Sequence, residues 1–209
     1  EAMQQAFLSG QDFHTLTAAK VFHVAPEEVT GRMRSSAKAV NFGIVYGISA
    51  FSLSQDIGVS VAEAKEYMER YFDTYRGVKR YMEQVVETAR EKGYVETLMH
   101  RRRALPELKS SNFNMRSFGE RVALNMPIQG TAADIMKLAM VRVEQRLKRE
   151  GLAAKLIMQV HDELIVECPE EEKETVERLL EEEMSGVVRL SVPLPAQAHS
   201  GKTWLEAKG

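Results

Sequence analysis

Apolar residues recur every three to four positions along most of the chain, which predicts a mostly helical protein. Thr30 is suited to cap one helix, and Ser60 with Glu63 forms a capping-box pattern at the start of another. Pro127 is expected to end a helix before it, because proline lacks the amide hydrogen that a helix interior needs. Helices are therefore expected near residues 1–8, 15–22, 30–48, 60–75, 78–92, 114–125 and 131–149.

The hydrophobic period changes in the last third of the chain. Leu156–Val160 and Leu164–Val166 are short apolar runs on either side of His161-Asp162-Glu163, which predicts a hairpin with a polar tip. An acidic helix over 170–184 and an extended stretch over 187–192 follow, and 94–98 also has strand character. Helices first and strands late predict an α+β fold, in which a mostly helical part accompanies a small antiparallel sheet.

Composition narrows the class of protein. The 209 residues are 44% hydrophobic and 28% charged, as in ordinary globular domains. No apolar run approaches the roughly 18 residues that a membrane span needs. Cys168 is the single cysteine, which excludes an internal disulfide framework and a thiolate zinc cluster and favours the reducing cytoplasm. The chain opens at Glu1 inside a helical pattern, so we expect a piece of a longer protein.

Charge is unevenly distributed although the formal net charge is only -2. Residues 162–183 hold 11 acidic and 2 basic side chains, whereas residues 1–161 hold 23 basic and 18 acidic ones. A basic body is compatible with a phosphate-rich partner. A solvated helix face explains the acidic run equally simply, so charge alone does not decide the function.

The helix expected over 30–48 has two unlike faces. At 100° per residue, one apolar stripe is formed by Met33, Ala37, Val40 and Ile44. Opposite this stripe, Arg34, Lys38, Phe42 and Tyr46 follow one another in steps of four, with the cations first and the aromatic rings last. Cations suit phosphates, and aromatic rings suit a sugar and a base, so the order fits a nucleoside triphosphate along the helix. A solvated basic face with two covered aromatic rings fits the geometry as well.

The pattern Arg34-x3-Lys38-x2-Asn41-Phe42-Gly43-x2-Tyr46-Gly47 resembles the fingers motif of the polymerase I-like enzymes of DNA polymerase family A. The resemblance implies that Arg34 and Lys38 bind the triphosphate and that Lys38 also donates a proton to the leaving pyrophosphate. It further implies that Phe42 stacks on the deoxyribose and that Tyr46 lies beside the template base. His14, in Gln11-Asp12-Phe13-His14, resembles a further phosphate contact of the family.

The same resemblance implies a function for the residues at the hairpin tip. Taken alone, Asp162-Glu163 is best explained as a pair of turn residues. Within the family it resembles the palm motif, which implies that Asp162 binds catalytic Mg²⁺, that Glu163 supports it as a less certain ligand, and that His161 lies near the primer terminus. The family's second metal-binding aspartate stands in an Asp-Tyr-Ser motif, which these 209 residues lack. We therefore expect the chain alone to be inactive in two-metal catalysis.

A third group of residues is expected to contact DNA. Arg121, Asn125 and Gln129 recur every four residues, next to a segment starting at Pro127 that again resembles the family. Such donors can bind the minor-groove acceptors that all base pairs share, and so check pair shape without reading sequence. Asn125 as a helix cap is the alternative. Arg101–Arg103 is expected to form a basic turn, which either faces phosphates or is simply solvated.

Together these features predict the fingers, over 1–110, and the C-terminal part of the palm, over 111–209 with its hairpin at 155–167. The expected activity is that of a DNA-directed DNA polymerase, a nucleotidyltransferase of replication and repair. Its expected partners are primer-template DNA, dNTPs and Mg²⁺, and the longer enzyme is expected to be monomeric and bacterial, near the nucleoid. Three rival classes are a single-subunit RNA polymerase, against which Phe42 argues, a non-catalytic nucleic-acid module and a metal-dependent phosphohydrolase.

Overall fold

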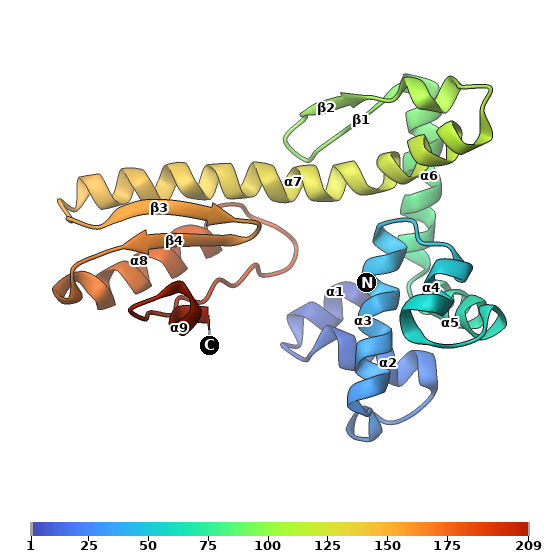
Figure 1. Cartoon of the computed structure of the whole chain (residues 1–209), viewed down its shortest axis with the longest axis horizontal. Coiled ribbons are helices and arrows are strands. Elements are labelled where there is room, and N and C mark those ends of the chain that lie inside the picture. The colour runs from blue at the N-terminus through green and yellow to red at the C-terminus, as the bar shows by residue number, and fades with distance from the viewer. Residues whose placement is uncertain (1, 209) are drawn as a thin grey trace. The chain divides into compact units, whose positions relative to one another are not determined.

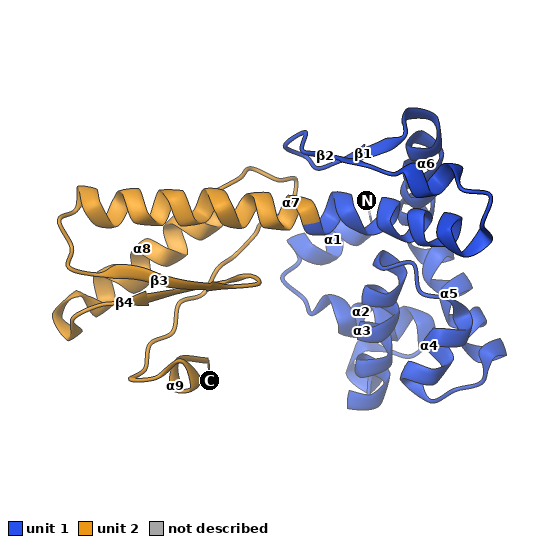
Figure 2. Cartoon of the chain, turned by 45° about the horizontal axis from the view of Figure 1, so that its top comes forward, with its two compact units in different colours: residues 1–129 blue, residues 130–209 orange. Residues whose placement is uncertain are grey.

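The computed structural model describes residues 2–208, and the chain divides into two compact units, residues 1–129 and residues 130–209 (Figure 2). The mostly helical first unit, with one short β-ribbon, is labelled in Figure 1. Its elements are α1 (Ala2–Leu8), α2 (Phe13–Phe22), η1 (Pro26–Glu28), α3 (Gly31–Val45), α4 (Ala50–Ile57), α5 (Val61–Thr74), α6 (Arg76–Lys92), β1 (Tyr94–Glu96), β2 (Arg102–Ala104), η2 (Pro106–Lys109) and the beginning of α7 (Phe113–Arg149).

The core of the first unit is formed where α3 packs against α2, α4 and α5. Val40 and Ile44 of α3 are buried together with Leu53 of α4. The apolar stripe expected on this helix therefore faces the core, and its opposite side remains outside. Ala64, Tyr71 and Tyr75 complete the cluster from α5 and its end.

The predicted helix starts are confirmed by their capping bonds. Thr30 Oγ1 accepts a hydrogen bond from the amide of Met33 at 3.3 Å, so α3 begins directly after Thr30. Ser60 and Glu63 form the capping box of α5. These bonds satisfy amide groups that the first turn of a helix leaves without partners, which fixes where each helix enters the core.

The basic segment at 101–103 differs from the prediction. Arg102 and Arg103 lie on β2, which pairs antiparallel with β1 through Val95 and Arg103, whereas the turn lies just before them. His100 adopts the left-handed conformation there, with φ 62°. The prediction of a basic turn was wrong because Arg102 lies opposite Glu96 in the ribbon: its Nε pairs with Oε2 of Glu96 at 3.2 Å, and its guanidinium carbon lies 4.6 Å from the centroid of the Tyr94 ring. The arginines are thus presented along a strand.

The predicted helix end before Pro127 is also wrong. α7 runs without a break from Phe113 to Arg149, with Pro127 inside it. Ala123, Pro127 and Thr131 follow one another in steps of four and are all buried, so the proline ring lies on the packed side of the helix. Packing along this side outweighs the hydrogen bond that a proline removes from a helix.

The second unit contains the end of α7, a β-hairpin and two further helices. The remaining elements are β3 (Lys155–Val160), β4 (Glu163–Glu167), η3 (Glu170–Glu172), α8 (Lys173–Ser185) and α9 (Trp204–Lys208). The predicted hairpin is confirmed, with Val160 opposite Glu163 at its tip and a register shift between Leu156 and Met158. The extended stretch expected over 187–192 is irregular, since no strand is formed there in the described chain.

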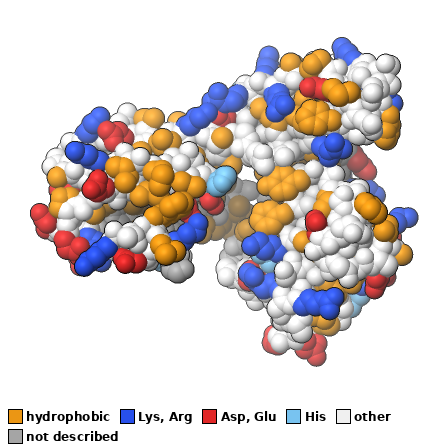
Figure 3. Space-filling model, viewed as in Figure 1, with side chains coloured by type: hydrophobic (Ala, Val, Ile, Leu, Met, Phe, Trp, Pro, Cys, Tyr) orange, Lys and Arg blue, Asp and Glu red, His pale blue; other side chains and the backbone are white. Residues whose placement is uncertain are grey.

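The second unit buries its core between the end of α7, the hairpin and α8. Val143 and Leu147 of α7 pack with Val176 and Leu179 of α8. Hydrophobic side chains also gather on the visible face of this unit (Figure 3). On β3 itself, Ile157 is 56% exposed. With mostly helices and two small antiparallel sheets, the α+β class predicted from the sequence is confirmed.

Candidate active site

The outer face of α3 presents the four side chains that the sequence placed on it. Arg34 and Lys38 are exposed, and Phe42 and Tyr46 are 47% and 42% exposed. Large aromatic rings are usually covered in a folded protein, so two adjacent exposed rings mark a surface able to bind a planar ligand. Lys38 Nζ lies 5.9 Å from the centre of the Phe42 ring, which places a cation directly beside the aromatic end of the row.

Arg34 is held in place by an acidic side chain of α2. Its Nε and Nη2 donate to the two carboxylate oxygens of Asp12, at 2.8 and 3.1 Å. The hydrogen bond from Arg34 holds the pKa of the Asp12 carboxyl well below its usual range. Asp12 also caps α2 by accepting from the Thr15 amide at 2.9 Å, so one carboxylate fixes both a helix start and the direction of the guanidinium.

His14 is fixed by the buried side chain of Asn41. The Nδ2 of Asn41 lies 3.0 Å from Nδ1 of His14, and Asn41 is 6% exposed. An amide nitrogen only donates, so Nδ1 accepts and the ring hydrogen lies on Nε2. The His14 ring is also 5.8 Å from the Phe42 ring, centre to centre. His14 therefore joins the row on α3 as a neutral hydrogen-bond donor.

The protonation of His14 should be visible in the stability of the chain. Burial lowers the pKa of His14 from its ordinary value of 6.5, and the nearby Arg34 and Lys38 act in the same direction, against Asp12. The unfolded chain then binds more protons than the folded one, so the free energy of unfolding should fall as the pH drops below about 6.5. Urea unfolding between pH 5 and pH 8 measures this slope.

His14→Gln removes the titrating ring and should flatten that slope. His199→Gln is the matched control, because His199 is exposed and far along the chain, and this change should leave the slope as it is. Equal slopes in the wild type and His14→Gln would contradict a lowered pKa at His14. Asp12 does not interfere, since the stability contributed by its lowered pKa is lost only as the pH falls below its ordinary value of 3.8, outside the measured range.

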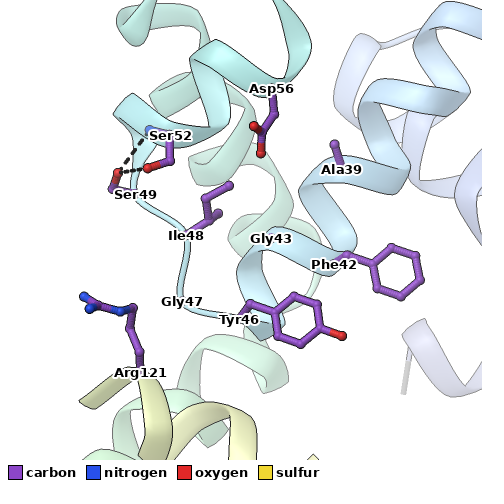
Figure 4. A pocket seen from close by; sticks show the side chains of 10 residues that line it. All are labelled: Ala39, Phe42, Gly43, Tyr46, Gly47, Ile48, Ser49, Ser52, Asp56 and Arg121. Atoms are coloured by element: carbon purple, nitrogen blue, oxygen red, sulfur yellow. Dashed lines mark hydrogen bonds between the residues drawn. The ribbon is translucent and has the colours of Figure 1, made fainter. Parts of the chain in front are cut away.

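A pocket of about 470 Å³ opens beside the aromatic end of α3, within the first unit (Figure 4). Phe42 and Tyr46 lie at one side of it and Arg121 of α7 at another, while Asp56 points inward from α4. A volume of this size is typical of small-molecule sites. Its walls are lined by Ala39, Phe42, Gly43, Tyr46, Gly47, Ile48, Ser49, Ser52, Asp56 and Arg121.

The three residues expected to contact DNA share one side of α7. Because α7 continues through Pro127, Arg121, Asn125 and Gln129 are spaced by whole turns of a single helix. Arg121 and Gln129 are exposed. Asn125 is half-buried, and its Oδ1 is buried without a hydrogen-bond partner among the described residues. This oxygen is an acceptor, so the donor role expected of Asn125 toward the minor groove falls to its Nδ2.

The tip of the β3–β4 hairpin carries the predicted metal-binding acid. His161 takes the left-handed conformation, with φ 50°, and its carbonyl accepts from Nε2 of Gln159 at 2.8 Å. Asp162 follows it and is exposed, and no side chain of residues 2–208 bonds to its carboxylate. Glu163, in contrast, accepts from Nε1 of Trp204 at 3.3 Å and pairs with Nζ of Lys208 at 3.2 Å.

The free carboxylate at the tip suits a divalent metal with few protein ligands. Mg²⁺ binds one or two carboxylates and completes its shell with water and phosphate oxygens. Asp162 fits this role, because its oxygens have no competing partner in the described chain. Among the described residues no three His, Cys, Asp or Glu side chains form a ready-made metal cage. The hairpin could therefore supply one ligand, not a complete site.

The sequence alone did not identify the residues that hold the site together. Asp12 and Asn41 orient Arg34 and His14, and Trp204 and Lys208 engage Glu163. Asn41 stands inside the motif on α3, directly before Phe42, which was a usable signal. Asp12 lies 22 residues from Arg34, and only the packing of α2 against α3 brings the two side chains together.

The chain belongs to DNA polymerase family A, whose profile matches residues 1–206. It is 55% identical over 206 residues to DNA polymerase I of Bacillus caldotenax and 54% identical over 208 residues to DNA polymerase I of Bacillus subtilis. These matches cover 99% and 100% of the chain but only 24% of each relative. The chain thus spans about a quarter of the length of these relatives.

A solved structure matches along the whole chain. The POL domain of Pol1 from M. smegmatis, in complex with DNA primer-template and dNTP, superposes with a TM-score of 0.95 at 44% identity. The match covers 100% of this chain and 37% of that chain. The resemblance inferred from the motif on α3 is therefore confirmed. No helix within residues 2–208 has the length and hydrophobicity needed to cross a membrane.

Proposed function

We propose that the chain is the nucleotide-binding and metal-binding part of a longer DNA-directed DNA polymerase. The observation that carries this proposal is the ordered outer face of α3, where Arg34, Lys38, Phe42 and Tyr46 are all exposed in the order of phosphates, sugar and base. Membership of DNA polymerase family A supports it. The reaction is the template-directed transfer of a dNTP to a primer 3′ hydroxyl.

The incoming dNTP lies along α3 in this proposal. Arg34, which Asp12 holds in a fixed direction, and Lys38 bind the triphosphate, and the Nε2 hydrogen of His14 adds a third contact. Lys38 donates a proton to the leaving pyrophosphate, so that less charge accumulates on the leaving oxygen. Phe42 covers the deoxyribose, and Tyr46 with the adjoining pocket accepts the template base.

The primer-template duplex contacts α7 and the hairpin. Arg121, Asn125 and Gln129, one turn apart on α7, donate to the minor-groove acceptors that all base pairs share. His161 lies near the primer terminus, next to Asp162. A set of donors that checks pair shape without favouring a sequence is what a polymerase needs, because it must move along any template.

Asp162 holds catalytic Mg²⁺ at the hairpin tip, and Glu163 is the neighbouring acid. When bound, the metal ions supply activation of the primer hydroxyl and neutralisation of the phosphate charge. The exposed, unpaired carboxylate of Asp162 supports this assignment. A second aspartate is required, and the family places it in the Asp-Tyr-Ser motif that these 209 residues lack.

The functional division of the chain follows from these sites. Residues 1–110 form the fingers, and residues 111–209 form the C-terminal part of the palm, with its hairpin at 155–167. The compact units meet at residues 129 and 130, within α7, so this long helix belongs to both. The enzyme acts as a monomer on DNA in the bacterial cytoplasm, close to the nucleoid, in replication and repair.

Primer extension tests the proposal directly. The longer polymerase that carries these residues should add the complementary dNTP to a primer in the presence of Mg²⁺, and the 209 residues alone should add none. Incorporation that ignores the template base, or extension with ribonucleotides only, would overturn the assignment in favour of another polymerase class. Robust extension by the 209 residues alone would contradict the need for a second aspartate.

Phe42→Tyr in the longer polymerase should raise the incorporation of dideoxynucleotides relative to dNTPs by about tenfold or more, since one hydrogen bond has about this value. The phenol hydroxyl would replace a hydrogen bond that the missing 3′ hydroxyl cannot make. Competition between ddNTP and dNTP in single-nucleotide extension measures the ratio. Tyr46→Phe removes a hydroxyl from the next turn and serves as control. An unchanged ratio in Phe42→Tyr would contradict contact of Phe42 with the sugar.

A further inference from the structure

The carboxylate of Glu163 is held at both oxygens by the C-terminal helix α9. Nε1 of Trp204 donates to Oε2 at 3.3 Å, and Nζ of Lys208 lies 3.2 Å from Oε1. The Lys208 Nζ also lies 5.3 Å from the centre of the Trp204 ring. The three side chains therefore form one contact group, which we name the α9 clamp.

In the α9 clamp, two hydrogen-bond donors of one helix face the same carboxylate, that of Glu163. Trp204 and Lys208 are four residues apart, so both lie on the same side of α9. The beginning of α9 is fixed by its own contacts: the Lys202 amide donates to Oε2 of Glu206 at 2.7 Å, and the Glu206 amide donates to Oγ1 of Thr203 at 3.3 Å. These contacts hold α9 in the conformation that brings both donors together.

The two neighbouring acids at the hairpin tip differ in their side-chain contacts. Asp162 is exposed and bonds to no side chain in the described part of the chain, whereas neither oxygen of Glu163 is free of a donor. Each oxygen of Glu163 keeps a second lone pair, but the ammonium group of Lys208 beside Oε1 offsets the carboxylate charge and repels a metal cation at the same place. The resemblance already implied the lesser role for Glu163, and these contacts give that difference a physical reason.

We propose that Glu163 anchors the hairpin tip to α9 and that Trp204 and Lys208 are positioning residues for Asp162. The inference rests on the proposed function, in which Asp162 binds the catalytic metal. Glu163 is the first residue of β4, so fixing its side chain limits the directions available to the residue before it. The contacts are partly exposed, so each is weak and the clamp acts through the pair.

A double-mutant cycle in the longer polymerase tests the clamp. The variants are E163Q, K208M, W204F and the combination of E163Q with K208M, and the probe is Mn²⁺ bound in the presence of primer-template and measured by electron paramagnetic resonance. E163Q and K208M should each weaken Mn²⁺ binding about threefold to tenfold, which is less than the roughly tenfold to hundredfold typical of residues that orient a metal ligand, because these contacts are partly exposed. The combined variant should lose no more than either alone, because both changes release the same contact.

The controls separate this inference from folding and from the proposed function. K202M removes a lysine from the residue two positions before α9 and should leave Mn²⁺ binding unchanged. K208R should restore at least half of the loss in K208M. Backbone hydrogen exchange at residues 161–163 should speed up in W204F and K208M but not in K202M. Absence of template-directed extension by the wild type would refute the proposed function. The Mn²⁺ binding and hydrogen-exchange results would still decide whether Trp204 and Lys208 position the hairpin tip.

Three results would overturn the clamp. If E163Q weakens Mn²⁺ binding while K208M and W204F change neither Mn²⁺ binding nor hydrogen exchange, Glu163 is a direct metal ligand. If the losses in E163Q and K208M add fully in the combined variant, the two residues act separately. A gain in Mn²⁺ affinity for K208M would also favour the ligand role, because it would release Glu163 toward the metal.

Discussion

Lys38→Ala in the longer polymerase should lower the rate of nucleotide incorporation by a factor of about 10²–10³, which is the range for removing one group that stabilises transition-state charge. Lys38 is exposed beside Phe42, and no carboxylate of the described chain pairs with it. Its ammonium group is therefore available to the triphosphate and to the leaving pyrophosphate. Single-turnover incorporation under saturating dNTP measures the rate, and fluorescence anisotropy of a labelled primer-template measures DNA affinity.

The DNA dissociation constant should change much less, by about threefold at most, because one lysine among many phosphate contacts contributes little to duplex affinity. Arg32→Ala is the matched control, since Arg32 lies on the same helix but outside the row of four, and it should leave the rate nearly unchanged. Lys38→Arg, which keeps the charge, should recover part of the rate. Equal losses of rate and DNA affinity in Lys38→Ala would mean that Lys38 belongs to a DNA-binding surface.

Asp162→Asn should reduce incorporation about a thousandfold or more, because loss of metal coordination removes several kcal/mol of charge stabilisation. The change keeps the size of the side chain and the hairpin turn, since asparagine also favours turns. Mn²⁺ binding in the presence of primer-template should be lost to a similar degree. Rapid-quench incorporation and electron paramagnetic resonance provide the two measurements.

A comparison with the neighbouring residue Glu163 tests whether the effect is specific to Asp162. Glu163→Gln should have a far smaller effect than Asp162→Asn, because the Glu163 carboxylate is already engaged by α9. Thermal unfolding should show that both variants fold like the wild type. Comparable losses in the two variants would indicate two equivalent metal ligands, and full activity of Asp162→Asn would remove the metal-binding role from the hairpin.

Local signals in the sequence were sufficient for most helices of this fold. Thr30 and Ser60 mark helix starts through side-chain caps, and these are interactions within a few residues. At Pro127 the local sequence signal led to a wrong prediction. Its local effect predicts a helix end, but the ring is buried on the same side as Ala123 and Thr131, and tertiary packing decided the outcome.

The part of the candidate site that lies on a single helix, α3, could be predicted from the sequence. The 3.6-residue period places Arg34, Lys38, Phe42 and Tyr46 on a single face, and that face is exposed as expected. Partners distant in sequence were not predictable in this way. Asp12 reaches Arg34 across 22 residues, and Trp204 reaches Glu163 across 41, because no periodicity links residues on different elements.

The glycine in the last turn of α3, Gly43, sets a narrow limit on how this region can change. A Cβ atom at Gly43 would lie 2.7 Å from Cγ2 of Ile48, closer than real side chains approach one another. Even alanine would force the Ile48 side chain to shift, and Ile48 lines the pocket together with Ser49 and Ser52. A change at this one position would therefore reshape the wall of the pocket beside Tyr46 without altering any side chain of the exposed row Arg34, Lys38, Phe42 and Tyr46.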